Sequence, residues 1–283
     1  MNIVVFSCLI LYIPIRAIGL GVSIDFLYDT RDKKFVYFIF CWTFWIIGVV
    51  FAILSDFSEL DSTKEFLLVL NAMFAAIGTI FFVGGIFKYF MTVSLKIIIA
   101  IIISFILTTF LLYLYINYTL SILFSSNFLN VAMFSTYVVP PLKKKEFIEY
   151  MGKSIRWFYL LIIMSLIYLP SSIYILFSWE SFGLYDSEDT LLILINYIPP
   201  IVANVLIIIL LVHLEYTIST REKFILKDKY SHNLGNIMQV IYSSADIIKT
   251  VAKLEKEQED ILKLVEGKCK EASQIIKEIR SIK

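Results

Sequence analysis

The sequence predicts an all-α integral membrane protein. A seven-transmembrane-helix bundle over residues 1–214 is followed, over residues 215–283, by a cytoplasmic antiparallel helical hairpin that dimerises as a four-helix bundle. Composition is the first observation, since the 283 residues are 59% hydrophobic and 17% charged, against roughly half and a quarter in soluble domains. The second is a set of seven apolar stretches, each near the roughly 20 residues that span a bilayer. The third is the charge distribution, because residues 215–283 hold 13 Lys/Arg and 11 Asp/Glu of the chain's 25 and 24.

The seven apolar runs are expected to be helices, because lipid requires each segment to satisfy its own backbone hydrogen bonds. They cover residues 3–24, 35–55, 66–87, 95–116, 119–139, 157–178 and 190–214. The fifth run is unusually polar, and we expect its polar side chains to hold neighbouring helices together, with a ligand pocket as the alternative. These polar residues are Ser121, Ser125, Ser126, Asn127, Asn130, Ser135 and Thr136.

Arg16 lies inside the first run, toward its expected cytoplasmic end. Long basic side chains near a helix end commonly extend to the lipid headgroups, and this is what we expect of Arg16. The alternative is a functional charge inside the membrane.

Basic residues in the connections predict the orientation. The connections after the first, third and fifth runs carry ten Lys and Arg residues, whereas the alternate connections carry only Lys64. An excess of basic residues marks the cytoplasmic side, so the N-terminus is expected outside and the C-terminus in the cytoplasm of a multi-pass protein of the cell membrane. The ten are Arg31, Lys33, Lys34, Lys88, Lys96, Lys143, Lys144, Lys145, Lys153 and Arg156.

Several function classes are disfavoured by the residues. A retinal protein needs a lysine deep in its last span, and the stretch 191–212 has none. The triplet Phe87-Lys88-Tyr89 and the stretch Asn196-Tyr197-Ile198-Pro199 do not match the motifs expected of a G-protein-coupled receptor. Acidic and basic residues nearly cancel in the tail, so no nucleic-acid partner is expected. The three cysteines and two histidines have no metal-like spacing, so we expect no metal.

The tail is expected to form two helices. No Pro or Gly interrupts residues 201–234, so the seventh span can continue into the cytoplasm as one helix. The polar stretch Glu255–Asp260 predicts the turn. Each helix carries an apolar seam with alternating steps of three and four residues, too short to be stable alone, so we expect a homodimer through residues 234–279. The seams are Leu234, Met238, Ile241, Ala245, Ile248 and Ala252, then Leu262, Val265, Cys269, Ala272, Ile276 and Ile279.

The first seam begins beside the stretch Ser231-His232-Asn233-Leu234-Gly235-Asn236. It resembles the phosphoacceptor box of sensor histidine kinases, in which an aliphatic residue and then Thr or Asn follow the histidine two and four positions on. Asn233 stands where most of these kinases have an acidic residue, and Ile237 stands where proline is common. The resemblance implies His232 as phosphoacceptor, Asn233 as the group that orients its ring, and Asn236, with Gln239, in phosphatase or transfer chemistry.

The resemblance also implies partners. An ATP-binding kinase domain would phosphorylate His232, and a response regulator receiver domain would take the phosphate. The 283 residues contain no Gly-rich phosphate-binding loop, so we expect no cofactor in this chain. ATP would be used only through a kinase domain, in cis beyond Lys283 or on a separate protein, and only then would the chain act as a histidine protein kinase.

The alternative hypothesis is a multi-span membrane transport or scaffold protein whose cytoplasmic hairpin only dimerises it. It predicts that transport or assembly survives the loss of His232 and that the polar fifth run lines a path. The two hypotheses differ in whether the histidine carries the function.

Overall fold

A computed structural model describes residues 2–89, 94–142, 147–148, 151–178, 189–251 and 256–281. Lys143, Lys144, Lys145 and Ala252, which the sequence singles out, lie outside these residues, as does the side chain of Ile279. The chain divides into two compact units, Met1–Leu214 and Glu215–Lys283. The described elements are α1 (Ile3–Thr30), α2 (Lys34–Asp56), α3 (Asp61–Lys88), α4 (Leu95–Tyr115), α5 (Tyr118–Leu142), η1 (Gly152–Ser154), α7 (Ile155–Ser178), α8 (Thr190–Val251) and α9 (Lys256–Ser281).

The helical segments that are long and apolar enough to cross a membrane number six among the described residues. They are Ile3–Thr30, Lys34–Asp56, Asp61–Lys88, Leu95–Tyr115, Gly152–Leu169 and Thr190–Thr250. The fifth predicted run forms α5, a helix of 25 residues that is not among the six. On α4, large apolar side chains such as Ile97, Leu107 and Leu114 are 58% to 69% exposed. Exposed apolar surface of this kind is consistent with association with a lipid bilayer.

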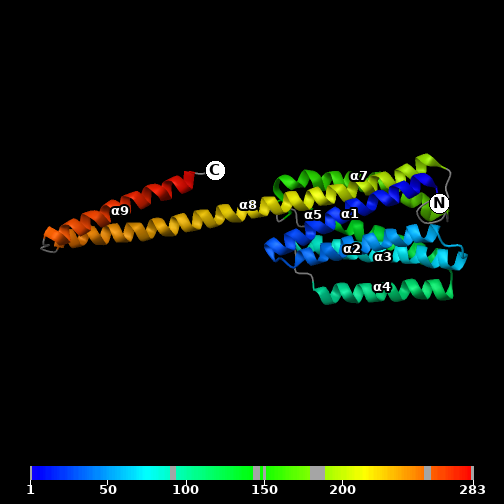
Figure 1. The fold of residues 1–283 in the computed structure, drawn as a ribbon. Helices are drawn as coiled ribbons and strands as arrows, with labels where there is room; N and C mark the ends of the chain where they lie inside the picture. Colours follow the sequence, from blue (N-terminus) through cyan, green and yellow to red (C-terminus); the bar gives the residue numbers. More distant parts are fainter. Residues whose placement is uncertain are drawn as a thin grey trace. The chain divides into compact units, whose positions relative to one another are not determined.

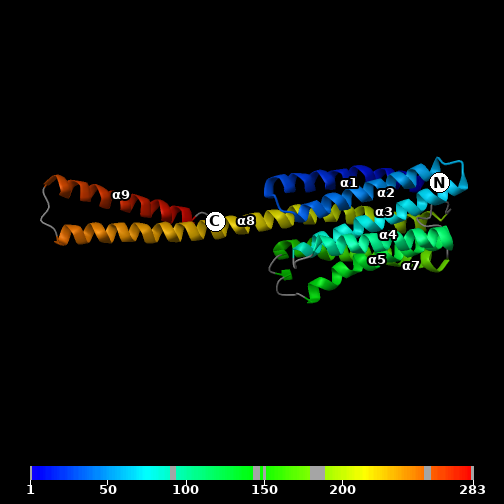
Figure 2. The same ribbon diagram turned by 90° about the horizontal axis from the view of Figure 1, so that it is seen from below.

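The helices of the first unit lie side by side (Figures 1 and 2), and small residues let them approach closely. The α-carbon of Gly78 on α3 lies against the Trp45 ring of α2, and that of Gly85 lies against the Phe38 ring. In the same way, Gly19 on α1 faces Trp42, which is fully buried. Close packing around aromatic rings therefore joins α2 to both α1 and α3.

Polar side chains join α4 to α5, as the sequence predicts for part of the fifth run. Ser121 donates its hydroxyl hydrogen to the carbonyl oxygen of Thr109, at 2.9 Å. The hydroxyls of Thr109 and Ser125 lie 3.4 Å apart, and all three side chains are buried. Hydrogen bonds of this kind hold helices together where lipid offers no partner.

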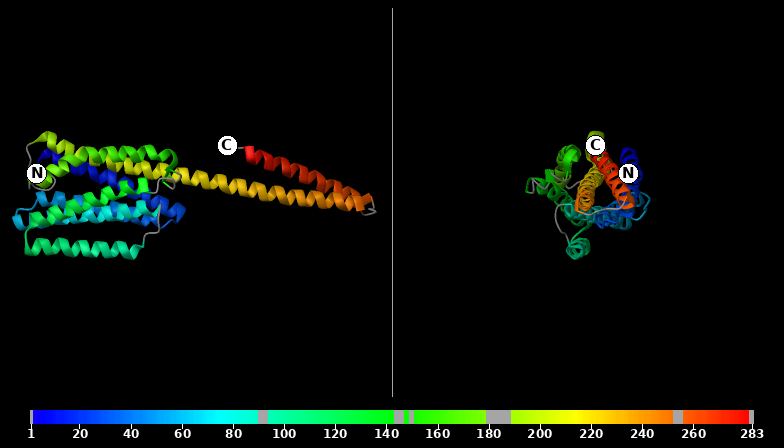
Figure 3. Two further views of the ribbon diagram at one scale, coloured as in Figure 1. Left: turned by 180° about the vertical axis from the view of Figure 1, so that it is seen from behind. Right: turned by 90° about the vertical axis from the view of Figure 1, so that its left-hand side faces the viewer.

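In the second unit, α9 runs back alongside the last part of α8 (Figure 3). The predicted continuation of the last apolar run as a single helix is confirmed, since α8 extends without a break from Thr190 to Val251. The predicted turn over Glu255–Asp260 is wrong in its extent, because α9 already begins at Lys256. Charged residues are compatible with a first helical turn, and Glu257 and Glu259 there interact favourably with the helix dipole.

Candidate functional site

His232 lies on α8 in the second unit with an exposed side chain. An exposed imidazole is accessible to other proteins, as a phosphoacceptor must be. No part of the described hairpin covers it. The next residues on the same side of the helix are Asn236, one turn on, and Gln239, which is also exposed. Residues three and four positions apart are neighbours on a helix surface, so His232 and Asn236 lie together on the surface of α8.

The ring of His232 has one hydrogen-bond partner in the described residues. The Asn236 amide nitrogen lies 3.3 Å from Nδ1 of His232. An amide offers both a donor and an acceptor, so Asn236 can serve either ring tautomer. With the amide nitrogen as the donor, Nδ1 accepts the hydrogen bond and the ring proton lies on Nε2. Turning the Asn236 amide over would let its oxygen accept from a protonated Nδ1 and would leave the lone pair of Nε2 free. This is the tautomer that a nucleophilic Nε2 requires.

Asn233 has no hydrogen bond to the ring among the described residues, although the resemblance assigns it the ring-orienting role. Adjacent helical positions are about 100° apart, whereas Asn236 lies directly above His232. Asn236 therefore makes the contact expected of Asn233. Gln239 lies away from the ring and lines a groove between α8 and α9, together with Tyr242 and Cys269.

The hairpin buries only part of its two apolar seams. Ala245, Cys269 and Ile276 are buried where α8 and α9 meet, and Lys249 reaches across to Glu266 with Nζ 3.4 Å from Oε1. Other apolar side chains stay exposed on the single chain, among them Leu234, Ile237, Ile241, Ile248, Ile261, Leu264 and Ile275.

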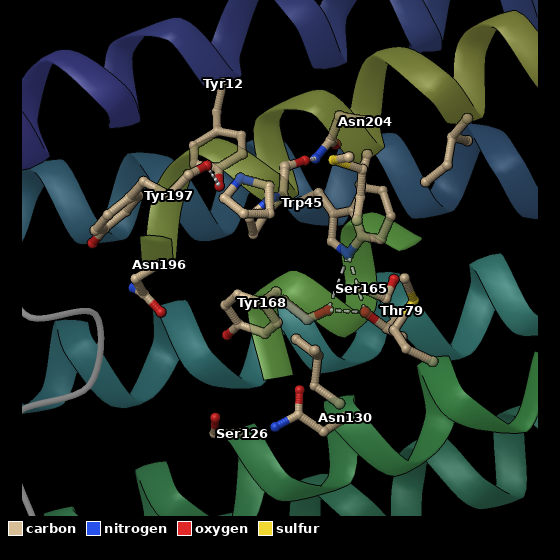
Figure 4. Close-up of a pocket in the computed structure, with 18 of the residues that line it drawn as sticks. Tyr12, Trp45, Thr79, Ser126, Asn130, Ser165, Tyr168, Asn196, Tyr197 and Asn204 are labelled. Carbon is tan, nitrogen blue, oxygen red and sulfur yellow. Dashed lines mark hydrogen bonds between the residues drawn. The ribbon is translucent and has the colours of Figure 1, made fainter. Parts of the chain in front are cut away.

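A second candidate site is a cavity inside the first unit, of about 210 Å³. It is lined from α1, α2, α3, α5, α7 and α8 (Figure 4). Ser126 and Asn130 of α5 face it. Some polar side chains of the fifth run therefore bind the neighbouring helix, and others line the cavity. Apolar and aromatic groups dominate the lining, with a few polar side chains, as in many small-molecule sites.

Arg16 lines this cavity, and the expectation that it extends to the headgroups is wrong. Its Nη1 donates to the carbonyl oxygen of Trp45 at 2.6 Å, and its Nε donates to Oδ1 of Asn204 at 3.3 Å. The guanidinium carbon lies 4.4 Å from the centre of the Tyr12 ring and 5.4 Å from that of Trp45. Because α1 extends from Ile3 to Thr30, Arg16 lies near its middle, and its side chain is held by α2 and α8.

The wall from α8 contains two consecutive prolines. Pro199 and Pro200 have no N–H, so the carbonyl groups four residues earlier lose their helical donors. Those carbonyls belong to Ile195 and Asn196. Side chains bind two other carbonyl oxygens of this segment: Tyr12 of α1 donates to that of Tyr197 at 3.2 Å, and Asn204 donates to that of Pro200, four residues before it on the same helix, at 2.6 Å. Asn204 thus links Arg16 to the proline segment.

Asn196 is the least satisfied polar group of the cavity wall. Its side chain is 7% exposed, and its Oδ1 has no hydrogen-bond partner among the described residues. A buried acceptor without a partner costs about 1–3 kcal/mol. The cavity therefore contains one acceptor that a bound molecule can satisfy.

In the described part of the chain, no group of three His, Cys, Asp or Glu side chains is placed to hold a metal ion. Comparisons of the chain with protein-family models, curated proteins and solved structures found no match. The resemblance to sensor histidine kinases therefore remains a prediction from the residues of the box.

Proposed function

We propose that the protein is a membrane-bound sensor of a two-component phosphorelay, which receives phosphate on His232 and passes it to a response regulator. The observation that carries the proposal is the exposed His232 ring with Asn236 at Nδ1, on the helix that also lines the intramembrane cavity. A change inside the bundle that moves α8 would alter the presentation of this imidazole to its partners.

The chemistry assigned to His232 is a phosphoryl transfer. Nε2 attacks the γ-phosphorus of ATP held by a kinase domain, a P–N bond forms, and the bond to the β,γ-bridging oxygen breaks to release ADP. This step requires the tautomer protonated at Nδ1, in which the Asn236 amide is turned over so that its oxygen accepts the Nδ1 hydrogen. In the second step a carboxylate of the receiver domain attacks the same phosphorus, the P–N bond breaks, and an acyl phosphate forms.

The dimer is part of the proposal. Exposed apolar side chains on one side of the hairpin, such as Leu234, Ile241 and Ile248, are suited to packing against a second copy. Two hairpins give a four-helix bundle with these residues inside. His232 lies on another face of α8, so dimerisation leaves it accessible.

The membrane topology is proposed from the charge pattern. With α5 as a seventh span beside the six apolar helices, an N-terminus outside puts the hairpin in the cytoplasm. This is the compartment in which kinase and receiver domains are found. Acidic loops such as the one with Asp56, Glu59 and Asp61 then face the outside.

The direct test is phosphorylation of the full chain in lipid nanodiscs by ATP and a histidine kinase catalytic domain. We expect an acid-labile, base-stable phosphate, as phosphohistidine chemistry requires, that is absent in His232→Gln. His213 is the other histidine of the chain, so His213→Gln is the matched control and is expected to label normally. Labelling that survives His232→Gln would refute the site.

One observation favours the transport alternative, namely the cavity that Ser126 and Asn130 of α5 line. A transporter would move a solute through this space and would not need His232. Flux measured in proteoliposomes that is unaffected by His232→Gln, together with no phosphorylation, would support that alternative over the phosphorelay.

A further inference from the structure

Arg16 is a cation inside the bundle, and its contacts in the described residues include no Asp or Glu side chain. No Asp or Glu occurs in the segments 33–55, 66–88, 95–142, 151–178 and 190–214. The first acidic residue after Arg16 on its own helix is Asp25, nine residues on and so about 13 Å away along the axis. A charge inside a membrane domain without a partner is unfavourable, and such residues commonly mark functional sites.

The guanidinium keeps donors for a ligand. Of the five N–H groups of an arginine, Arg16 uses one on Trp45 and one on Asn204, and the other three have no partner in the described residues. The rings of Tyr12 and Trp45 lie close to its guanidinium carbon, which fixes the orientation of the group. A fixed planar fork with free donors matches a carboxylate, which accepts two parallel hydrogen bonds.

Asn196 supplies a second, independent indication of a ligand. Asn196 lines the same cavity as Arg16, and its buried Oδ1 lacks a partner in the described residues. Asn196 precedes Asn204, the residue bound to Arg16, by eight positions on α8, or about 12 Å along a helix. The cavity wall therefore carries a cation at Arg16 and, at Asn196, an acceptor without a donor.

Size limits the ligand. An apolar cavity of about 150 Å³ accommodates benzene, so the 210 Å³ here suit an aromatic ring with small substituents. The rings of Tyr12, Trp45, Tyr168 and Tyr197 line this space and provide the faces on which a flat apolar body packs.

We propose that this cavity is a binding site for a small carboxylate with an aromatic body and a hydroxyl or amine at the far end. The carboxylate binds Arg16, the body packs among the aromatic rings, and the far donor binds Oδ1 of Asn196. The site does not depend on the role of His232. A ligand on Arg16 acts next to Asn204 and Pro200, and hence on α8.

The experiment measures equilibrium binding to the full chain in nanodiscs, with 4-hydroxyphenylacetate as the probe. Three analogues separate the contributions: 4-hydroxyphenylacetamide removes the charge, phenylacetate removes the donor, and palmitate tests a long acyl chain of lipid origin. We expect saturable binding of the probe, weaker by about 10- to 100-fold for the amide because a charge-assisted pair is lost, and several-fold weaker for phenylacetate. Palmitate is expected not to compete, because the cavity is too small for it.

Two variants locate the contacts. Arg16→Gln is expected to bind the probe about as weakly as the wild type binds the amide. Asn196→Val is expected to bind the probe and phenylacetate equally, because the acceptor for the hydroxyl is gone. The comparison of acid with amide uses only the wild-type protein, so it holds even if a variant fails to fold.

Equal affinity for the acid and the amide, competition by palmitate, or no saturable binding of either small acid would overturn the proposal. None of these results involves phosphorylation, so failure of the carboxylate site and failure of the phosphorelay are distinguishable.

Discussion

The exposed seam of the hairpin gives a quantitative prediction for the dimer. In the single chain, Ile241 is 38% and Ile248 is 47% exposed. Truncation to Ala removes three carbons, worth about 2.4 kcal/mol when fully buried, at about 0.8 kcal/mol per CH₂. Because roughly two fifths of each side chain remains for a partner to cover, we expect each truncation to remove about 1 kcal/mol of dimerisation free energy per side chain.

A dimer contains each residue twice, so the double variant Ile241→Ala/Ile248→Ala is expected to lose about 4 kcal/mol, which is about a thousand-fold in the dissociation constant. The assay is energy transfer between two fluorescently labelled pools of the full chain, diluted in detergent micelles. Ile247→Ala is the control: Ile247 is 62% exposed but lies about 100° around the helix from Ile248, away from the seam. An unchanged dissociation constant in the double variant, or equal weakening by Ile247→Ala, would refute the reasoning.

Two further predictions concern stability. Gly19→Ala places a Cβ within 2.5 Å of the buried Trp42 ring, so we expect it to destabilise the fold by about 1–3 kcal/mol and to lower the melting temperature in detergent. Gly21→Ala is the control: its Cβ meets nothing within 4 Å, so the melting temperature is expected to stay unchanged or to rise slightly. An equal decrease in both variants would contradict the packing of Gly19 against Trp42. Lys249→Ala removes a partly exposed ion pair to Glu266. Because such pairs contribute under about 1 kcal/mol, we expect hydrogen exchange in α9 to become less than about fivefold faster. A larger increase would contradict this small contribution of the ion pair.

The continuous helix α8 could be predicted from the sequence because its physical cause is local. No Pro or Gly occurs in residues 201–234, and this alone predicts that the last apolar run and the charged segment after it form one helix. Helix ends were less predictable. The first run ends at residue 24 by hydropathy, yet α1 continues to Thr30, because Asp25 and Asp29 interrupt the apolar pattern without interrupting backbone hydrogen bonds.

That error has a consequence at the candidate sites. With α1 ending early, Arg16 was expected near the headgroups, whereas its position in the middle of α1 and its contacts with Trp45 and Asn204 depend on how the helices pack. No single-sequence pattern contains that information. In contrast, the pairing of His232 with Asn236 has a local signal, because residues four apart are neighbours on a helix, and the spacing alone could have identified Asn236 as the ring partner.

The central claim is that His232 is the phosphorylated residue, and its most direct measurement is the site of phosphate on the intact protein. After incubation of the full chain in nanodiscs with ATP and a histidine kinase catalytic domain, mass spectrometry under basic conditions locates the modification. The account predicts phosphate on the peptide containing His232, none in His232→Gln, and an unchanged yield in His213→Gln. Phosphate on any other residue, or equal yields in the wild type and His232→Gln, would contradict it.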